Sequence, residues 1–189
     1  MRHLTISTFV VSILLTSAVA ANEFGDELRS LADQDVNAWA SHAAVISAVK
    51  KQNQEHKGLT QSKIDKLDQT WRSQVGSGGD LIDRILGNDL SEFLKQETSK
   101  HQGLYTEIFV TDNLGLNVGQ SDITSDYWQG DEAKWQVPYE EQELQIGAIE
   151  LDESTQTYQS QVSAPVIDPD SKSVIGVITV GVNVEQLAQ

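Results

Sequence analysis

The first half of the chain carries apolar residues at helical spacing. From Asn22 to His56 they recur at steps of three and four, which predicts one long amphipathic helix. No proline interrupts this segment, and Gly58 just beyond it is typical of a helix end. The members of the stripe are Leu28, Ala32, Val36, Trp39, Ala43, Ile46 and Val49.

Shorter helices are expected to follow this long one. The same spacing predicts helices over residues 60–75, 81–86 and 90–99. Thr60 is a suitable N-cap for the first of them, and Asn88 or Asp89 for the last. The glycine-rich residues 76–79 separate the first of these helices from the second.

The second half of the chain has the patterns of β-strands. Strands are expected over residues 105–111, 116–121, 146–151, 157–166 and 173–182. The turn-rich tetrapeptide Asp112-Asn113-Leu114-Gly115 predicts a hairpin between the first two. The last strand is apolar on both faces, which is typical of a central strand covered on both sides. Residues 122–136, polar and aromatic, form an excursion without strand alternation.

This order of elements predicts an α+β fold with a central antiparallel sheet of about five strands. We expect the long N-terminal helix to cover one face of the sheet. The excursion over residues 122–136 is expected to cover the other face.

The N-terminal residues have the pattern of a cleavable secretory signal. Arg2 and His3 precede an apolar run, and Ala18-Val19-Ala20 provides small residues for cleavage near Ala20 or Ala21. The run is short for a membrane span, although a retained anchor is the alternative. We therefore expect a signal peptide over residues 1–20, one domain over residues 21–189 and a periplasmic location.

Composition narrows the classes of function further. The formal net charge of −15 disfavours binding to nucleic acid or to anionic lipid, because both are themselves negatively charged. The absence of cysteine excludes disulfides, thiolate chemistry and lipid attachment through a cysteine.

Several matched segments identify the chain as resembling the Cache family of sensor domains, which have a PAS-like fold. Residues 109–115 look like the family's hydrophobic strand with its Asp-x-x-Gly turn, and residues 121–128 like the excursion that follows. Residues 163–166 and 175–182 look like its closing strands. The resemblance covers nearly all of residues 21–189 and implies a single Cache domain with a small-molecule ligand.

The resemblance also implies where that ligand lies. In the family the excursion lines a pocket on one face of the sheet, and the second helix faces the same pocket. The candidate ligand-binding residues are Trp71, Arg72, Tyr105, Tyr127, Trp128, Asp131, Lys134 and Trp135. Ordinary packing is the alternative for the aromatic residues, and local ion pairs for Arg72 and Lys134.

A cation among aromatic residues favours a short organic acid as the ligand, held by Lys134 or Arg72. No cofactor, metal site or catalytic residue is expected, because the chain has no motif for a nucleophile, a zinc site or a phosphate loop. The carboxylates Asp122, Asp126, Asp131 and Glu132 match no calcium loop with fixed ligand positions.

The sequence therefore predicts a periplasmic, non-enzymatic sensor domain that acts through a separate partner, a membrane sensor or a transporter. The alternative is an interaction protein without a ligand of its own, which pairs as a homodimer through the long helix.

Overall fold

A computed structural model describes residues 22–152 and 156–187 of the chain. The predicted signal peptide over residues 1–20 lies outside the described residues, as does most of the turn between the fourth and fifth strands. No helix in the described part of the chain is both long enough and apolar enough to cross a membrane.

The centre of the molecule is an antiparallel sheet of six strands, in the order β2-β1-β6-β5-β3, with β4 also pairing with β5. The strands are β1 (Tyr105–Thr111), β2 (Asn117–Gln120), β3 (Gln145–Ile146), β4 (Glu150–Asp152), β5 (Thr157–Ile167) and β6 (Val174–Asn183). The expected α+β class is confirmed. A sixth strand arises because the segment predicted as one strand over residues 146–151 is divided into β3 and β4, separated by residues 147–149.

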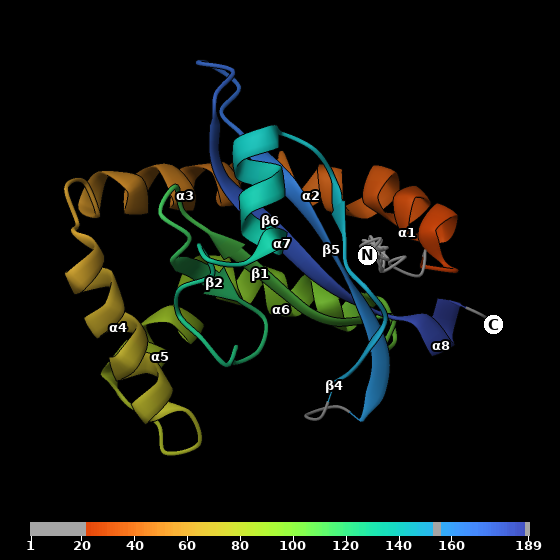
Figure 1. The fold of residues 1–189 in the computed structure, drawn as a ribbon, viewed down its shortest axis with the longest axis horizontal. Coiled ribbons are helices and arrows are strands. Elements are labelled where there is room, and N and C mark those ends of the chain that lie inside the picture. The colour runs from red at the N-terminus through yellow and green to blue at the C-terminus, as the bar shows by residue number, and fades with distance from the viewer. Residues whose placement is uncertain (1–21, 153–155, 188–189) are drawn as a thin grey trace, which may run out of the picture.

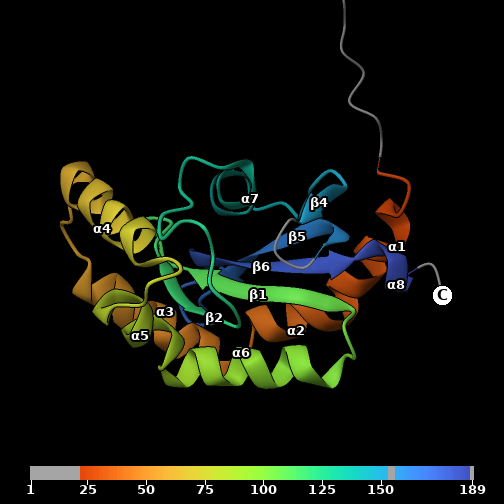
Figure 2. The same ribbon diagram turned by 90° about the horizontal axis from the view of Figure 1, so that it is seen from below.

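Helices cover both faces of this sheet. The helical segments are α1 (Gly25–Leu31), η1 (Ala32–Val36), α2 (Asn37–Ala40), α3 (Ala43–Glu55), α4 (Gln61–Gln74), α5 (Asp80–Leu86), α6 (Asp89–Lys100), α7 (Ala133–Gln136), η2 (Val137–Glu141) and α8 (Val184–Leu187). Figure 2 shows α2, α3 and α6 beneath the sheet and α7 above it. Strand β6 is central and is covered by helices on both faces, so its residues are apolar on both sides.

The expected single helix over residues 22–56 is wrong in one respect, because the chain breaks at Ser41 and His42. The Ser41 hydroxyl donates to the carbonyls of Asn37 and Ala38 and so closes α2. His42 has an extended backbone, and its ring nitrogen Nδ1 accepts a hydrogen bond from the amide of Ala44, so that it caps a new helix. The apolar stripe runs through the break and hides it.

The apolar stripe of these helices packs on the sheet. Of the predicted stripe, Leu28, Ala32, Val36 and Val49 are fully buried in the main core, together with apolar residues of β1, β5 and β6. These four side chains are already covered within one chain. Dimerisation through this stripe stays a prediction.

The sequence also predicts helix N-caps at Thr60 and at Asn88 or Asp89. The side chain of Thr60 makes no capping hydrogen bond, whereas the side chain of Asn88 accepts a hydrogen bond from the amide of Ser91.

A second core lies at one end of the sheet, where α4 and α5 project from the rest of the molecule (Figure 1). Its buried residues are Ile64, Trp71, Leu81, Ile82, Ile85, Leu116 and Tyr127. Two of these, Leu116 and Tyr127, belong to the hairpin and to the excursion. The second core therefore joins the two helices to the segments that precede α7.

Candidate ligand-binding site

Helix α4 holds the first part of the excursion in place. Oδ1 of Asp68 accepts hydrogen bonds from the amides of Tyr127 and Trp128, at 2.9 and 3.1 Å. Trp71, one turn further along, is fully buried, and its indole nitrogen donates to the carbonyl of Thr124 at 2.8 Å. These bonds satisfy backbone groups that would otherwise lack partners in an irregular segment.

A buried carboxylate holds the hairpin turn and the second part of the excursion. Oδ1 of Asp112 accepts from the amides of Leu114 and Leu116, and Oδ2 lies 2.6 Å from Nδ1 of His56. The carbonyl of Asp112 accepts from the indole nitrogen of Trp135 on α7, at 3.1 Å. The hairpin turn predicted from the sequence thus also positions α7.

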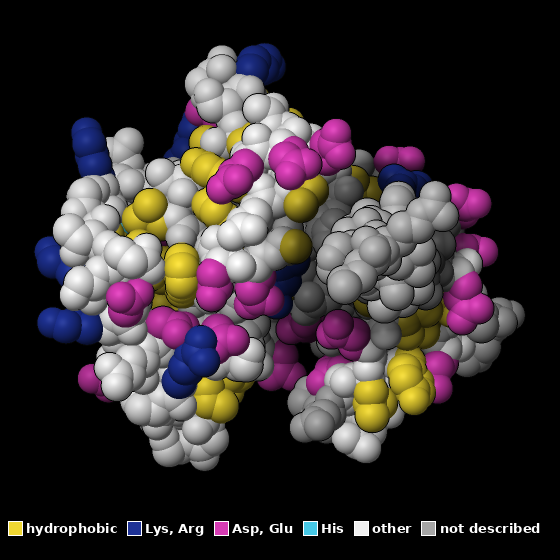
Figure 3. All heavy atoms as spheres, viewed as in Figure 1, with side chains coloured by type: hydrophobic (Ala, Val, Ile, Leu, Met, Phe, Trp, Pro, Cys, Tyr) yellow, Lys and Arg dark blue, Asp and Glu magenta, His cyan; other side chains and the backbone are white. Residues whose placement is uncertain are grey.

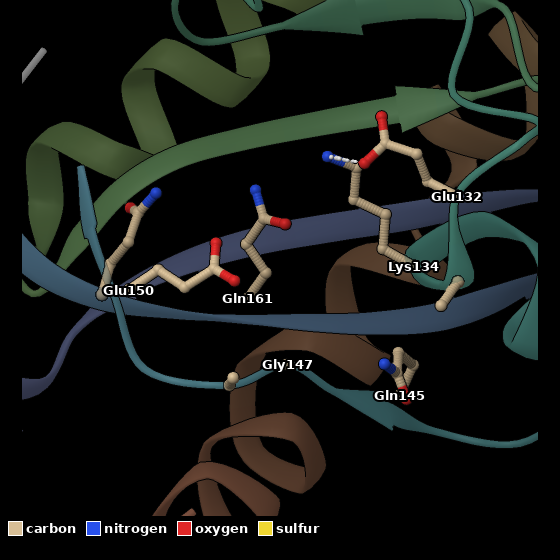
Figure 4. Close-up of a pocket in the computed structure, with 9 residues that line it drawn as sticks. Glu132, Lys134, Gln145, Gly147, Glu150 and Gln161 are labelled. Atoms are coloured by element: carbon tan, nitrogen blue, oxygen red, sulfur yellow. Dashed lines mark ion pairs between the residues drawn. The ribbon is translucent and has the colours of Figure 1, made fainter. Parts of the chain in front are cut away.

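A hollow opens between α7 and the sheet (Figure 4). It consists of two adjoining parts of about 360 and 430 Å³, which share Lys134, Gln159 and Gln161 in their linings. Glu150 and Gln161 project to the same side of the sheet as Lys134 and Glu132 in Figure 4. The excursion therefore covers the expected face of the sheet and leaves room for a small molecule.

The lining of the hollow is polar, with a small apolar part. Its polar and charged members are Glu107, Thr124, Ser125, Gln129, Glu132, Lys134, Gln145, Glu150, Asp152, Gln159 and Gln161. Phe109 on β1 provides an aromatic surface, with Nζ of Lys134 5.6 Å from the centre of its ring. Asp and Glu side chains are also spread over the outer surface of this face (Figure 3).

Glu107 lies on the floor of the hollow, on β1. One of its carboxylate oxygens accepts from the side-chain amide of Gln161 on β5, at 2.9 Å. Burial raises the pKa of the Glu107 carboxyl above its ordinary value, while the hydrogen bond from Gln161 and the charge of Lys134 oppose the shift. The charge of this carboxyl group therefore depends on its burial and on the neighbouring Gln161 and Lys134.

Of the eight residues expected to contact a ligand, Lys134 lines the hollow. Its Nζ pairs with Glu132 at 2.9 Å, and a fifth of its side chain is exposed. Asp131, three residues earlier, is exposed at the surface. Contact of Lys134 with a ligand stays a prediction, and a ligand would meet its charge together with that of Glu132.

The aromatic candidates are used in packing, which is the alternative reading of the sequence. Tyr127 is fully buried and stacks on Trp71, with ring centres 5.5 Å apart. The indole nitrogen of Trp128 donates to the carbonyl of Leu114, and Trp135 stacks on Tyr139. Tyr127, Trp128 and Trp135 are not among the residues that line the hollow.

Arg72 and Tyr105 are also placed away from the hollow. Arg72 pairs with Asp68 and with Asp126, so its guanidinium group is occupied by the protein's own carboxylates. Tyr105 lies on the helix side of the sheet, where its hydroxyl donates to Asp35 and its ring meets that of Trp39. The register of β1 shifts between Tyr105 and Glu107, so the bulge turns Tyr105 to the opposite face.

The residues that sequence reasoning missed lie on the strands. Gln159 and Gln161 are polar residues at alternate positions of β5, so they project from one face of the sheet, the face on which Glu107 of β1 also lines the hollow. That period of two was present in the sequence as a signal. Polar alternation on a strand ordinarily indicates a face in contact with water, so this pattern does not by itself indicate a ligand-binding site.

No family model and no curated protein matches this chain. Several solved structures resemble it, all at low identity. The sensor domain of the V. cholerae histidine kinase DctB has 14% identity and a TM-score of 0.39, over 86% of this chain and 58% of that chain. The sensory domain of the Campylobacter jejuni chemoreceptor Tlp3 has 12% identity and a TM-score of 0.43, over 86% and 66%.

The sensor domain of E. coli DcuS has 17% identity and a TM-score of 0.40, over 68% of this chain and 91% of that chain. This chain spans less than two thirds of the DctB and Tlp3 chains that it matches. The solved structures are sensor domains of the Cache type, the class that the sequence resembles.

Proposed function

We propose that this protein is a ligand-binding sensor domain that takes a small polar molecule into the hollow between α7 and the sheet. The observation that supports the proposal most strongly is the hollow itself. Its walls come from α7, β1, β4 and β5, and two separate sets of buried hydrogen bonds, at Asp68 and Asp112, hold the covering segment in place. Such an arrangement encloses a ligand on a rigid support.

Binding without catalysis fits the chemistry of this lining. The described residues of the hollow offer amides, carboxylates, a single lysine and the hydroxyls of Thr124 and Ser125, with neither a histidine nor a cysteine among them. A hydroxyl or thiol activated by a histidine, which many hydrolytic mechanisms use, is therefore not assembled from these side chains. A receptor needs only the fixed polar groups that the hollow provides.

The location and the partner follow from the sequence as part of the same proposal. The signal pattern over residues 1–20 favours export, and an exported domain of this kind acts by docking on a membrane sensor or a transporter. The short organic acid favoured by the sequence stays a prediction, and it depends on Lys134. That lysine faces Glu132 in the structure, so an incoming acid would compete with a carboxylate already in place.

The proposal is tested by filling the hollow. Ala148 is an exposed residue on its rim, and Ala148→Trp would occupy the space with an indole ring. Thermal unfolding would be followed with a panel of small acids, amines, amino acids and polyols. We expect at least one class to raise the Tm of the wild type, and the shift to be lost in Ala148→Trp.

The control is Ala38→Trp, the same substitution on the exposed surface of α2 and away from the hollow. It is expected to retain the full shift. An undiminished shift in Ala148→Trp would place the ligand elsewhere and contradict the proposal.

A further inference from the structure

Two exposed apolar side chains line one part of the hollow. Val75, at the end of α4, is 41% exposed, and Ile123, in the excursion, is 42% exposed. They are two of the five large apolar side chains that are exposed in the described part of the chain, and both line the part of about 430 Å³. Single exposed apolar side chains are ordinary, but two from distant segments in the lining of one cavity indicate a binding surface.

The same part of the hollow has an apolar floor. Phe109 on β1 belongs to its lining and is 1% exposed. In the adjoining part of about 360 Å³, the described lining residues with an apolar side chain are Ala133 and Ala148. The large apolar side chains of the hollow are thus gathered in one of its two parts.

One buried tryptophan fixes the spacing of the two exposed side chains. The carbonyl of Trp71 accepts a hydrogen bond from the amide of Val75, at 3.0 Å. The indole nitrogen of Trp71 donates to the carbonyl of Thr124, the residue after Ile123, at 2.8 Å. Because Trp71 is fully buried, Val75 and Ile123 are held relative to each other through a single fixed residue.

The chain on the other side of Val75 is also held. Oε1 of Gln74 accepts hydrogen bonds from the amides of Leu81 and Ile82, at 3.1 and 3.2 Å, and so joins the end of α4 to the start of α5. A surface that is already ordered loses little conformational freedom on binding, so more of the contact energy appears as affinity.

We infer that Val75 and Ile123 hold a short alkyl chain of the ligand beside the ring of Phe109. The ligand is then a polar molecule with an apolar tail, and its polar end lies among the amide and charged side chains of the adjoining part. This inference rests on the proposed function and names the chemical class of the ligand.

The experiment first selects the polar head of the probe. Hexanoate, hexylamine, 1-hexanol and hexanamide have the same number of carbons and differ in the charge and hydrogen bonding of the head. Isothermal titration calorimetry would measure the affinity of each for the wild type. The head that binds most tightly is then measured with chains of two to six carbons. We expect the affinity to rise by about fourfold for each methylene that enters the apolar part.

Matched variants locate the alkyl chain. Val75→Thr keeps the shape of the side chain, and Ile123→Thr keeps the branch at Cβ. Each is expected to weaken binding of the six-carbon probe by about fivefold and to leave the two-carbon probe unchanged. Ile167→Thr is the control, because Ile167 is 43% exposed at the end of β5 and is not among the lining residues. It is expected to bind both probes as the wild type does. All three side chains are exposed, so we expect no effect on folding.

The outcomes distinguish this inference from the proposed function. An affinity that does not change with chain length would overturn the inference and leave the sensor role intact. A chain-length effect that both Val75→Thr and Ile123→Thr retain would also overturn it, because the alkyl chain would then lie elsewhere.

The thermal panel separates the remaining outcomes. Failure of all four six-carbon probes would overturn the inference alone if another class raises the Tm of the wild type and loses that effect in Ala148→Trp. Failure of the four probes together with the whole panel would overturn both the inference and the proposed function.

Discussion

Arg72 and Asp126 form an ion pair in which Nη2 of the arginine lies 2.7 Å from Oδ1 of the aspartate. The same guanidinium group donates to Asp68 through Nε, also at 2.7 Å. Arg72 thus spans helix α4 and the start of the excursion, beside the amides that Asp68 holds. The pair joins two segments that are more than fifty positions apart in the chain.

The strength of this junction lies in Asp68. Its side chain is largely buried and accepts two backbone amides, whereas the side chain of Arg72 is 60% exposed and its ion pairs are screened by water. We expect Asp68→Ala to lower the free energy of unfolding by about 2 kcal/mol or more, because the amides of Tyr127 and Trp128 lose their acceptor. Chemical denaturation would measure it, with the exposed Asp65→Ala on the same helix as control. Equal losses in both variants would contradict this account.

The buried carboxylate of Asp112 is expected to matter still more. It is fully buried, and its two oxygens lie against the amides of Leu114 and Leu116, Gln52 and His56. We expect Asp112→Ala to cost about 3 kcal/mol, since several buried groups lose their partner at once. Asp122→Asn, in the exposed part of the excursion, is the comparison and is expected to change stability by less than about 0.5 kcal/mol. A loss of stability in Asp112→Ala of no more than about 0.5 kcal/mol would show that this carboxylate does not hold the hairpin turn.

Gly115 lies where the hairpin turn approaches the excursion closely, at Gly130, and its substitution tests whether that approach matters for stability. Its φ of +81° is in the left-handed region, and a Cβ atom there would lie 2.6 Å from the Cα of Gly130. Gly103 has a similar φ of +85° with open space around it, so it isolates the effect of backbone conformation. Gly103→Ala is expected to cost about 1 kcal/mol. Gly115→Ala is expected to lower stability clearly more than Gly103→Ala does. Thermal unfolding of both variants would measure the difference. Equal losses of stability would mean that the close approach to Gly130 is unimportant.

The pH dependence of stability is expected to report on Glu107. Burial raises the pKa of this carboxyl, so the folded state binds its proton more tightly than the unfolded state does. The stability from this group is therefore complete below the ordinary value of 4.5 and is lost as pH rises through the raised pKa. The groups that act on it are Gln161 and Lys134, which lower the pKa, and Asp152 and Asp122, which raise it.

Glu107→Gln is accordingly expected to be more stable than the wild type at neutral pH and equal to it in acid. Denaturation at a series of pH values, without ligand, would measure the difference. A difference that does not vary with pH would contradict the assignment.

The elements with strong local patterns could be predicted from the sequence. The strand Tyr105–Thr111 begins and ends where expected, and the hairpin turn at Asp112 is followed by β2. The break at His42 was missed because its cause is a cap inside an unbroken apolar stripe.

The candidate site was predicted less well, for a reason that the bulge in β1 illustrates. The excursion was expected over the correct face of the sheet, but a one-residue shift decides that Glu107 faces the hollow and Tyr105 does not. Likewise, the donors of Trp71, Trp128 and Trp135 are engaged by carbonyls distant in the chain. Such hydrogen bonds depend on tertiary structure, so they cannot be predicted from the local pattern of apolar and polar residues.

The central claim is that the ligand lies between α7 and the sheet, and nuclear magnetic resonance can locate it directly. A titration with a ligand found in the thermal panel would be followed through the side-chain amides of the glutamines. The account predicts shifts at Gln129, Gln159 and Gln161, with none at Gln52, which lies in a groove between α3, α5 and α6 on the opposite face. Shifts at Gln52, with the other three unmoved, would contradict it.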